Sequence, residues 1–398
     1  MSTSLHTPST GTPAPARQAS RRERILGDLG SAESGPTLIV IGGLHGNEPA
    51  GVLGLERIFE RLVAGGVQLQ GRLVGLTGNR AALEVGRRFI AQDLNRAWLP
   101  EKLSMVHSGE ELLFAEDREI AELDGLLQKF IDEALGTPYA LDIHTTSGPG
   151  PAFSVVHDTL PNRRFARAMP IPIALGLEEE LNGTLTDYLT EQGAVALSVE
   201  AGQHDEAISA ERAEAAIWIA MDVAGILAES ERSEVDRART LLASGDSNLP
   251  SAVEVRYRHG LDDRSVFEML PEFSSFQHVR AGSPLATEAG EAVSSPISGF
   301  LLMPLYQDQG SDGFFVTSPV RPVWLGLSTA LRRMHLERWL GRLPGIHAVP
   351  EQPGTFLVNR KVARLVARQI FHLLGYRRRE HSKTHLVMQR RPEPRNGS

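Results

Sequence analysis

Two histidines and two glutamates lie at the ends of short apolar segments. His45 and Glu48 lie in GLHGNE, which follows the run LIVI, whereas His144 ends YALDIH and Glu200 ends AVALSVE. Open α/β sheets bind their ligands at the carboxyl ends of strands, and catalytic zinc is held by three nitrogen or oxygen ligands with one position left for water. We therefore predict a zinc site at His45, Glu48 and His144, with Glu200 as the base that activates the attacking water.

Each of these patterns also has a simpler interpretation. The H-x-x-E spacing of His45 and Glu48 arises by chance in many chains, and a lone histidine is more often just hydrogen-bonded. Glu200 could be buried in a salt bridge to an arginine, since an uncompensated buried charge is costly. Asp142 lies on the same side of its strand as His144. It could accept a hydrogen bond from a ligand histidine, or be satisfied by backbone donors.

A second polar segment, RFIAQDLNR, contains three groups that could converge on an anionic substrate: Arg88, Asn95 and Arg96. Arginine suits carboxylates because its planar guanidinium donates two parallel hydrogen bonds. Taken alone, however, the segment is typical of a solvated turn.

The elements that would position these groups follow a regular order. Apolar, β-branched runs predict strands, and apolar residues at helical spacing predict helices. Their alternation over about 200 residues favours an α/β fold with an open, mostly parallel sheet, which we place at residues 23–248. The expected strands are 38–41, 73–76, 139–143 and 194–199, and the expected helices are 50–63, 117–135 and 211–227.

The pattern changes after about residue 248. Residues 253–259 alternate as an antiparallel strand does, and residues 282–315 are short apolar pieces broken by Gly, Pro and Ser. We therefore expect a smaller C-terminal all-β domain at 249–325. A mainly helical extension is expected at 326–398, with its clearest helix at 359–375. Its apolar stripe is Val362, Leu365, Val366, Ile370 and Leu373.

The charge is unevenly distributed along the 398 residues. Residues 326–398 contain 15 Lys or Arg and 4 Asp or Glu, a net charge of +11, although the whole chain carries −8. We favour docking of this basic tail on its own body or on a sister subunit, which makes a homo-oligomer possible. Binding to nucleic acid or to an anionic membrane is the less favoured hypothesis.

Composition limits the remaining possibilities. The chain has no Cys, so a metal site must use His and carboxylates. No apolar run is long enough to predict a membrane span. Residues 1–22 are rich in Ser, Thr and Pro and lack the apolar centre of a secretory signal. We expect a disordered arm there and a cytoplasmic protein.

The motifs GGLHGNE, RFIAQDLNR, LDIHTTS and SVEAG, in this order, resemble the succinylglutamate desuccinylase/aspartoacylase family, which is related to the zinc carboxypeptidases. The resemblance runs from about residue 24 to about residue 319. It implies that one Zn²⁺ per chain is held by His45, Glu48 and His144. It also implies that Glu200 takes a proton from water and delivers it to the leaving amine.

The resemblance assigns further roles to the substrate-facing residues. Arg88 would polarise the scissile carbonyl, and Asn95 and Arg96 would hold the α-carboxylate of a small anionic substrate. The β-rich C-terminal domain would help to close the pocket and would offer Tyr306 as a substrate contact.

Two departures leave the substrate open. Aspartoacylases have an additional Arg about ten residues before the catalytic Glu, where this chain reads TEQG at residues 190–193, and Thr145 replaces their Asn. Neither N-acetylaspartate nor N-succinylglutamate is singled out. The expected activity is zinc-dependent hydrolysis of an amide in an N-acyl amino acid or a related N-acyl amine. The alternatives are a carboxypeptidase-like metallopeptidase and a non-catalytic binding protein that retains its metal.

Overall fold

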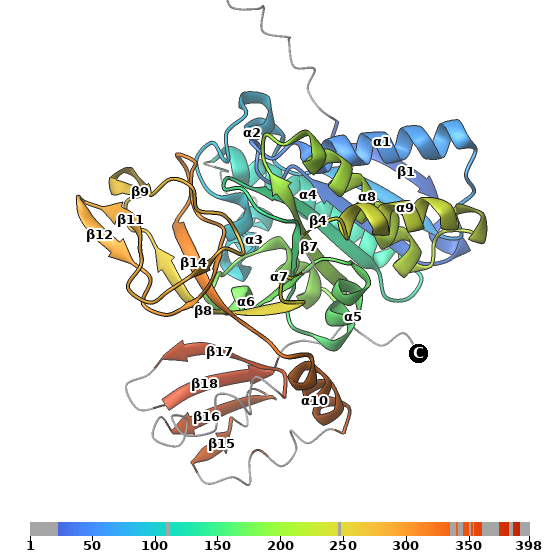
Figure 1. Ribbon diagram of the computed structural model, residues 1–398. Coiled ribbons are helices and arrows are strands. Elements are labelled where there is room, and N and C mark those ends of the chain that lie inside the picture. Colours follow the sequence, from blue (N-terminus) through green and yellow to red (C-terminus); the bar gives the residue numbers. More distant parts are fainter. Residues whose placement is uncertain are drawn as a thin grey trace, which may run out of the picture.

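The computed structural model describes residues 23–390, except 109–111, 113, 246–247, 335–339, 341–344, 350–351, 353, 360–373 and 382–384. Its centre is an eleven-stranded sheet in the order β1-β3-β2-β4-β7-β5-β6-β8-β14-β13-β10. Figure 1 shows β4 and β7 in the middle of the molecule. The strands that carry or flank the site are β2 (Thr37–Gly42), β3 (Arg72–Thr77), β4 (Tyr139–Thr146), β5 (Phe153–Val155), β6 (Ile173–Leu175) and β7 (Val195–Gln203).

The middle of this sheet is parallel and buried on both faces. β2 pairs in parallel with β3 and β4, and β4 pairs in parallel with β7. Every residue of β2, the segment TLIVIG, is buried. Such continuous β-branched runs are typical of strands covered on both faces. The predicted α/β fold with an open, mostly parallel sheet is confirmed, and the carboxyl ends of β2, β4 and β7 meet at one edge.

Two layers of helices enclose the sheet. The first core layer includes apolar side chains of α1 (Ala50–Gly65), α5 (Leu160–Ala168), α8 (Ala207–Ala224) and α9 (Arg232–Leu242). The second includes those of α3 (Pro100–His107), α4 (Ala115–Asp132) and α7 (Leu185–Glu191). Each helix turns its apolar stripe toward the strands, as amphipathic helices on a sheet do.

The β-rich segment continues the main sheet. β8 (Ala252–Gly260) pairs in parallel with β6, and β14 (Asp312–Pro319), β13 (Gly299–Leu302) and β10 (His278–Val279) add antiparallel strands beyond it. A separate three-stranded sheet consists of β9 (Phe267–Met269), β11 (Pro284–Glu288) and β12 (Glu291–Ser294). The β-strands expected after residue 248 are thus present, and the loops between them reach over the carboxyl edge of the sheet.

The expectation of a mainly helical tail is wrong for the described residues. Helix α10 (Pro322–Arg333) is followed by a four-stranded antiparallel sheet of β15 (Ile346–Ala348), β16 (Thr355–Asn359), β18 (His385–Arg390) and β17 (Tyr376–His381). Val358 and Met388, on neighbouring strands, are buried in the core of this sheet.

Two expectations concern residues outside the described part of the chain. They are the arm at 1–22 and nearly all of the helix at 359–375. Within the described part, no helix has the length and apolar character needed to cross a membrane.

Candidate metal centre and active site

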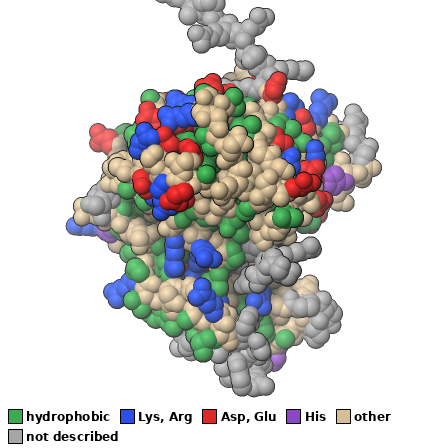
Figure 2. All heavy atoms as spheres, turned by 90° about the vertical axis from the view of Figure 1, so that its right-hand side faces the viewer, with side chains coloured by type: hydrophobic (Ala, Val, Ile, Leu, Met, Phe, Trp, Pro, Cys, Tyr) green, Lys and Arg blue, Asp and Glu red, His purple; other side chains and the backbone are tan. Residues whose placement is uncertain are grey.

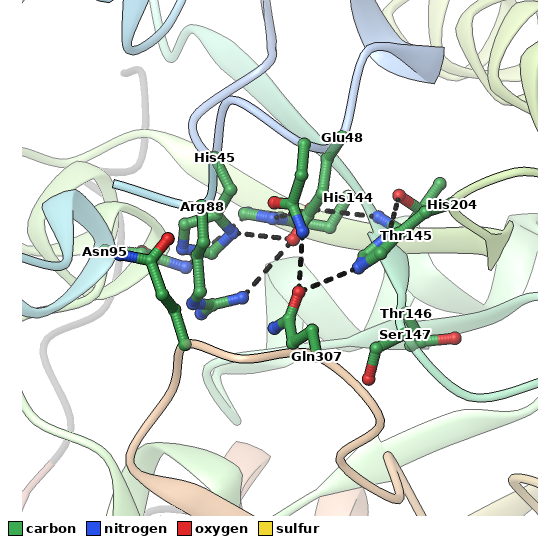
Figure 3. A network of polar contacts seen from close by, with 12 residues as sticks. His45, Glu48, Arg88, Asn95, His144, Thr145, Thr146, Ser147, His204 and Gln307 are labelled. Atoms are coloured by element: carbon green, nitrogen blue, oxygen red, sulfur yellow. Dashed lines mark hydrogen bonds and ion pairs between the residues drawn. The ribbon is translucent and has the colours of Figure 1, made fainter. Parts of the chain in front are cut away.

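Three buried side chains meet at the carboxyl ends of β2 and β4. His45 follows β2, Glu48 lies just before α1, and His144 lies within β4. One ligand atom from each lies within 4.8 Å of the other two. The Glu48 carboxylate lies between the two rings, with Oε1 2.8 Å from His45 Nδ1 and Oε2 2.9 Å from His144 Nδ1. Figure 3 shows the three side chains pointing to one place.

The second nitrogen of each imidazole faces another carboxylate. His144 Nε2 lies 2.8 Å from Asp142 Oδ2, and His45 Nε2 lies 3.0 Å from Asp93 Oδ1. Carboxylates that hold the far nitrogen of a ligand histidine fix its tautomer and orientation. The contact of Asp142 with His144 is thus the first of the two alternatives that the sequence left open. Asp93 was missed, although it lies inside RFIAQDLNR.

The glycine in the His45–Glu48 turn allows a close approach between loops. A Cβ atom on Gly46 would lie 2.0 Å from the carbonyl carbon of Ala82 in α2 (Arg80–Val85). Only a residue without a side chain fits this contact. Gly46 therefore lets the turn pack against α2 and keep His45 and Glu48 in place.

The electrostatics of the cluster suit a cation. Burial opposes ionisation of Glu48, yet His45 and His144 hold its pKa well below the usual range. Burial likewise opposes ionisation of Asp93, but Arg88 and His45 hold its pKa well below its ordinary value. Burial disfavours the charged form of His144, but Asp142 and Glu48 raise its pKa well above the usual value. The two-imidazole, one-carboxylate donor set fits zinc chemically.

Glu200 lies beside this set on β7, where it pairs in register with His144 of β4. Its Oε2 is buried and accepts no hydrogen bond, and no arginine or lysine of the described chain lies within salt-bridge distance of it. Burial, together with the charge of Glu48, raises the pKa of Glu200 to about 8. The salt-bridge alternative therefore has no support in the described residues, and the carboxyl is placed to exchange a proton near neutral pH.

The three groups of RFIAQDLNR line the same pocket as Glu200. Arg88 donates to Asp93 through Nε and Nη2, at 3.1 and 2.9 Å, and its Nη1 lies 3.4 Å from Glu48 Oε1. Asn95 Oδ1 accepts from the backbone of Leu185. Arg96 Nη2 donates to Asp312 at 2.9 Å, whereas its buried Nε has no partner. One donor of Arg96 is therefore left for a ligand.

A buried glutamate from α4 holds this segment. Glu116 is fully buried and accepts hydrogen bonds from the backbone N–H groups of Ile90, Ala91 and Gln92. The loop that carries Arg88 and Asp93 is thereby fixed to the body. Sequence spacing gave no indication of this contact, because Glu116 resembles any other acidic residue at the start of a helix.

The structure does not bring Tyr306 into the pocket. Its hydroxyl donates to the carbonyl of Leu270 and accepts from the N–H of Phe273, so it ties together the β-rich loops. The next residue, Gln307, faces the site instead. Gln307 Oε1 accepts from Asn47 Nδ2 at 2.6 Å and lies 3.1 Å from His204 Nε2 (Figure 3).

His204 is a further pocket residue that sequence reasoning missed. Its Nδ1 lies 2.7 Å from Thr145 Oγ1, and burial lowers its pKa. Because Gln307 Oε1 can only accept, His204 Nε2 carries the proton and Nδ1 accepts from the Thr145 hydroxyl. His204 therefore connects Thr145 to Gln307, which lies in the β-rich loops that close the pocket.

The part of the pocket wall formed by α7 and the residue before it contains no arginine. Thr190 is fully buried within α7, and its hydroxyl donates to the carbonyl of Thr186. The pocket is lined there by Thr184, Thr186 and Asp187. Asp187 Oδ1 lies 2.7 Å from His157 Nδ1.

The fold defines a class: a zinc carboxypeptidase-like α/β sheet, here with a His–Glu–His set at the carboxyl ends of its strands. The catalytic-domain model of the succinylglutamate desuccinylase/aspartoacylase family matches residues 34–221. This segment of the chain is thus similar to the catalytic domain of that family, in agreement with the resemblance drawn from the motifs.

Relatives with curated names match part of the chain. The succinylglutamate desuccinylase of Pseudomonas paraeruginosa is 33% identical over 117 residues, which are 29% of this chain and 33% of that protein. That of Erwinia tasmaniensis is 44% identical over 59 residues, 15% of this chain and 18% of that protein. The chain thus matches the first of these relatives over about a third of its length.

Solved structures extend the likeness in fold. The succinylglutamate desuccinylase of Vibrio cholerae aligns with a TM-score of 0.53 at 18% identity, covering 74% of this chain and 85% of that one. A product-bound ectoine utilization protein from Ruegeria pomeroyi aligns with a TM-score of 0.51 at 19% identity, covering 73% and 86%. At these identities the likeness shows the fold alone.

Proposed function

We propose that this protein is a zinc-dependent deacylase that hydrolyses the amide bond of a small N-acyl amino acid or a related N-acyl amine. The observation that carries the proposal is the buried set His45, Glu48 and His144 with the unpartnered Oε2 of Glu200 beside it. When bound there, zinc would act as a Lewis acid that polarises a carbonyl and lowers the pKa of water.

The position of Glu200 suits both proton transfers of amide hydrolysis. As a carboxylate it can accept a proton from the attacking water, and as a carboxylic acid it can give that proton to the leaving amine. A general base works best when its pKa lies near the working pH. Burial of Glu200 shifts its pKa upward, in the direction this role needs.

Arg88, Asn95 and Arg96 supply the remaining functions in this proposal. Arg88 lies within 3.4 Å of Glu48 and lines the pocket, so its charge is available where the carbonyl oxygen becomes negative. A donor at such a position contributes about 3–4 kcal/mol to transition-state stabilisation. Asn95 and the free Nε of Arg96 would bind the α-carboxylate of the substrate.

The part of the pocket wall formed by α7 and the residue before it favours an acyl group without its own carboxylate. Thr184 and Thr186 line it with Asp187, whose negative charge would repel a second anion. We therefore expect short neutral acyl groups, such as acetyl, to be better substrates than succinyl groups.

The test is a panel of N-acetyl and N-succinyl amino acids and of short peptides, assayed with zinc-loaded protein. Glu200→Gln should retain one zinc per chain and reduce kcat by about 10²–10⁴-fold. Glu291→Gln, an exposed substitution on β12, serves as the matched control. Near-normal turnover of Glu200→Gln would refute the proposal. Hydrolysis of peptides but not of N-acyl amino acids would instead indicate a carboxypeptidase-like enzyme.

A further inference from the structure

Helix α10 presents a stripe of apolar side chains to solvent. Val323, Leu327, Ala330 and Met334 follow one another at intervals of four, three and four residues, which places them on one side of the helix. Val323 is 78% exposed, Leu327 40% and Met334 67%, and the neighbouring Trp324 is 52% exposed. Contiguous apolar surface of this kind marks an interaction site.

The opposite side of α10 is already used for docking on the body. Arg332 donates to the backbone and the carboxylate of Asp158, and Ser328 accepts from Arg163 of α5. Leu325 packs against the main core. The helix is therefore held in a fixed orientation, and the stripe is the side that these contacts leave outward.

A basic groove lies between α5 and α10, beside the apolar stripe. Its lining contains Arg163, Arg164, Arg167 and Arg333 and no Asp or Glu. Arg163 pairs with Asp158, but no described residue offers Arg164, Arg167 or Arg333 a side-chain hydrogen bond or an ion pair. In a chain of net charge −8, such unbalanced positive charge points to an anionic partner.

The groove and the stripe form one surface. Thr329 and Arg333 line the groove from α10, so it runs alongside the apolar stripe on the same helix. In Figure 2 the lower part of this face carries blue and green side chains, whereas the red ones gather over the upper part. Positive charge and exposed apolar side chains therefore lie together, apart from the acidic body.

We propose that this surface docks on an anionic phospholipid membrane. Val323, Trp324, Leu327 and Met334 would enter the interface between headgroups and acyl chains, and the arginines of the groove would face the lipid phosphates. Interfacial helices combine apolar residues on one side with Lys or Arg on the other, and Trp favours the headgroup level.

Two other partners fit this surface less well. A nucleic acid would use the arginines but would leave the exposed apolar stripe without a partner. A second copy related by twofold symmetry would bring the same surface, and hence the same unpaired arginines, against itself. A lipid surface satisfies both the apolar stripe and the positive charge.

The test is co-sedimentation of the full chain with vesicles of phosphatidylcholine alone or mixed with phosphatidylglycerol. Binding should need phosphatidylglycerol and weaken with salt, because surface charges are screened. Arg164→Glu with Arg167→Glu should weaken it by about 25-fold or more, since each basic residue near such a surface contributes about fivefold. Val323→Ser with Leu327→Ser should also weaken it.

Matched controls place the same changes elsewhere on the body. Arg118 and Arg280 are exposed, and Arg118→Glu with Arg280→Glu should leave binding unchanged. Val63 and Val85 are 67% and 57% exposed, and their replacement by Ser should also have no effect. Trp98 and Trp218 are buried, and replacing the fourth tryptophan by Trp339→Phe leaves Trp324 as the exposed reporter. In that background a blue shift of tryptophan fluorescence with phosphatidylglycerol vesicles should vanish when Trp324→Phe is added.

Three results would overturn the proposal. The first is equal binding, or none, to the two kinds of vesicle at low salt. The second is a dimer in solution that Val323→Ser with Leu327→Ser dissociates, without any vesicle binding. The third is binding to DNA or RNA that needs the arginines but is unaffected by the serine substitutions. None of these measurements depends on hydrolase activity, so the docking surface and the proposed function are tested separately.

Discussion

Replacement of Asp93 by Asn should weaken metal binding although Asp93 is outside the ligand set. The Asp93 carboxylate lies 3.0 Å from His45 Nε2 and accepts two hydrogen bonds from Arg88. The substitution keeps the shape of the side chain and removes the charge that orients both groups. Loss of such an outer partner lowers metal affinity by about 10–100-fold.

The loss of zinc affinity can be measured as a smaller stabilisation of the folded protein by zinc. At a zinc concentration 100 times the Kd, binding stabilises the folded protein by about 2.7 kcal/mol. A Kd that is tenfold weaker leaves about 1.4 kcal/mol, and one that is 100-fold weaker leaves about 0.4 kcal/mol. Because one kcal/mol corresponds to about 2–4 °C for a domain of this size, the zinc-induced rise in Tm should shrink by several degrees.

The assay compares thermal unfolding with zinc and with a chelator, and a chromophoric chelator titration gives the Kd directly. Measurement against the chelator-treated state removes any effect of Asp93 on the metal-free fold. Asp28→Asn is the control, because Asp28 pairs with Arg72 in a similar two-bond contact on β1 (Ile25–Gly30). An Asp93→Asn protein with the wild-type Kd would refute the role assigned to this carboxylate.

Three further predictions concern the site and its surroundings. Gly46→Ala should reduce metal affinity more than Gly65→Ala does, because its Cβ would lie 2.0 Å from Ala82 whereas that of Gly65 meets only Val67 at 3.4 Å; chelator titration of both variants tests this. Burial raises the pKa of Glu200 from 4.5 to about 8, so the folded state binds this proton more tightly than the unfolded state. Its contribution to metal-free stability should be lost as the pH rises through about 8, and Glu200→Gln should flatten that part of the profile in denaturant melts. Asp158→Ala should destabilise the protein by about 3–5 kcal/mol, because it leaves Arg163 and Arg332 buried without their carboxylate; an unchanged denaturation midpoint would contradict this.

The parallel sheet could be predicted because burial of a strand determines which residue types it contains. Runs such as LIVI in β2 are apolar at every position, and only a strand covered on both faces requires that. The short strands of the tail have no comparably clear sequence pattern. Apolar residues at helical spacing favour a helix at 359–375, whereas TFLVN in β16 is a short strand whose burial follows no regular alternation. Strands of three to six residues give too few positions for a periodicity to be read from the sequence.

The clustering of His45, Glu48 and His144 could be predicted because each lies where a strand ends, and the topology of the sheet brings those ends together. Their partners are set by contacts that no spacing records. Gln307 reaches Asn47 across 260 positions, and Glu116 holds a loop about 25 residues before it in the chain. Tyr306 and Gln307 illustrate the point, since neighbours on one loop face opposite ways and only the course of the backbone decides which one enters the pocket. Conversely, the buried carboxylates of Asp93 and Asp142 would be costly without the imidazoles they hold, so the candidate metal site and the fold around it depend on one another.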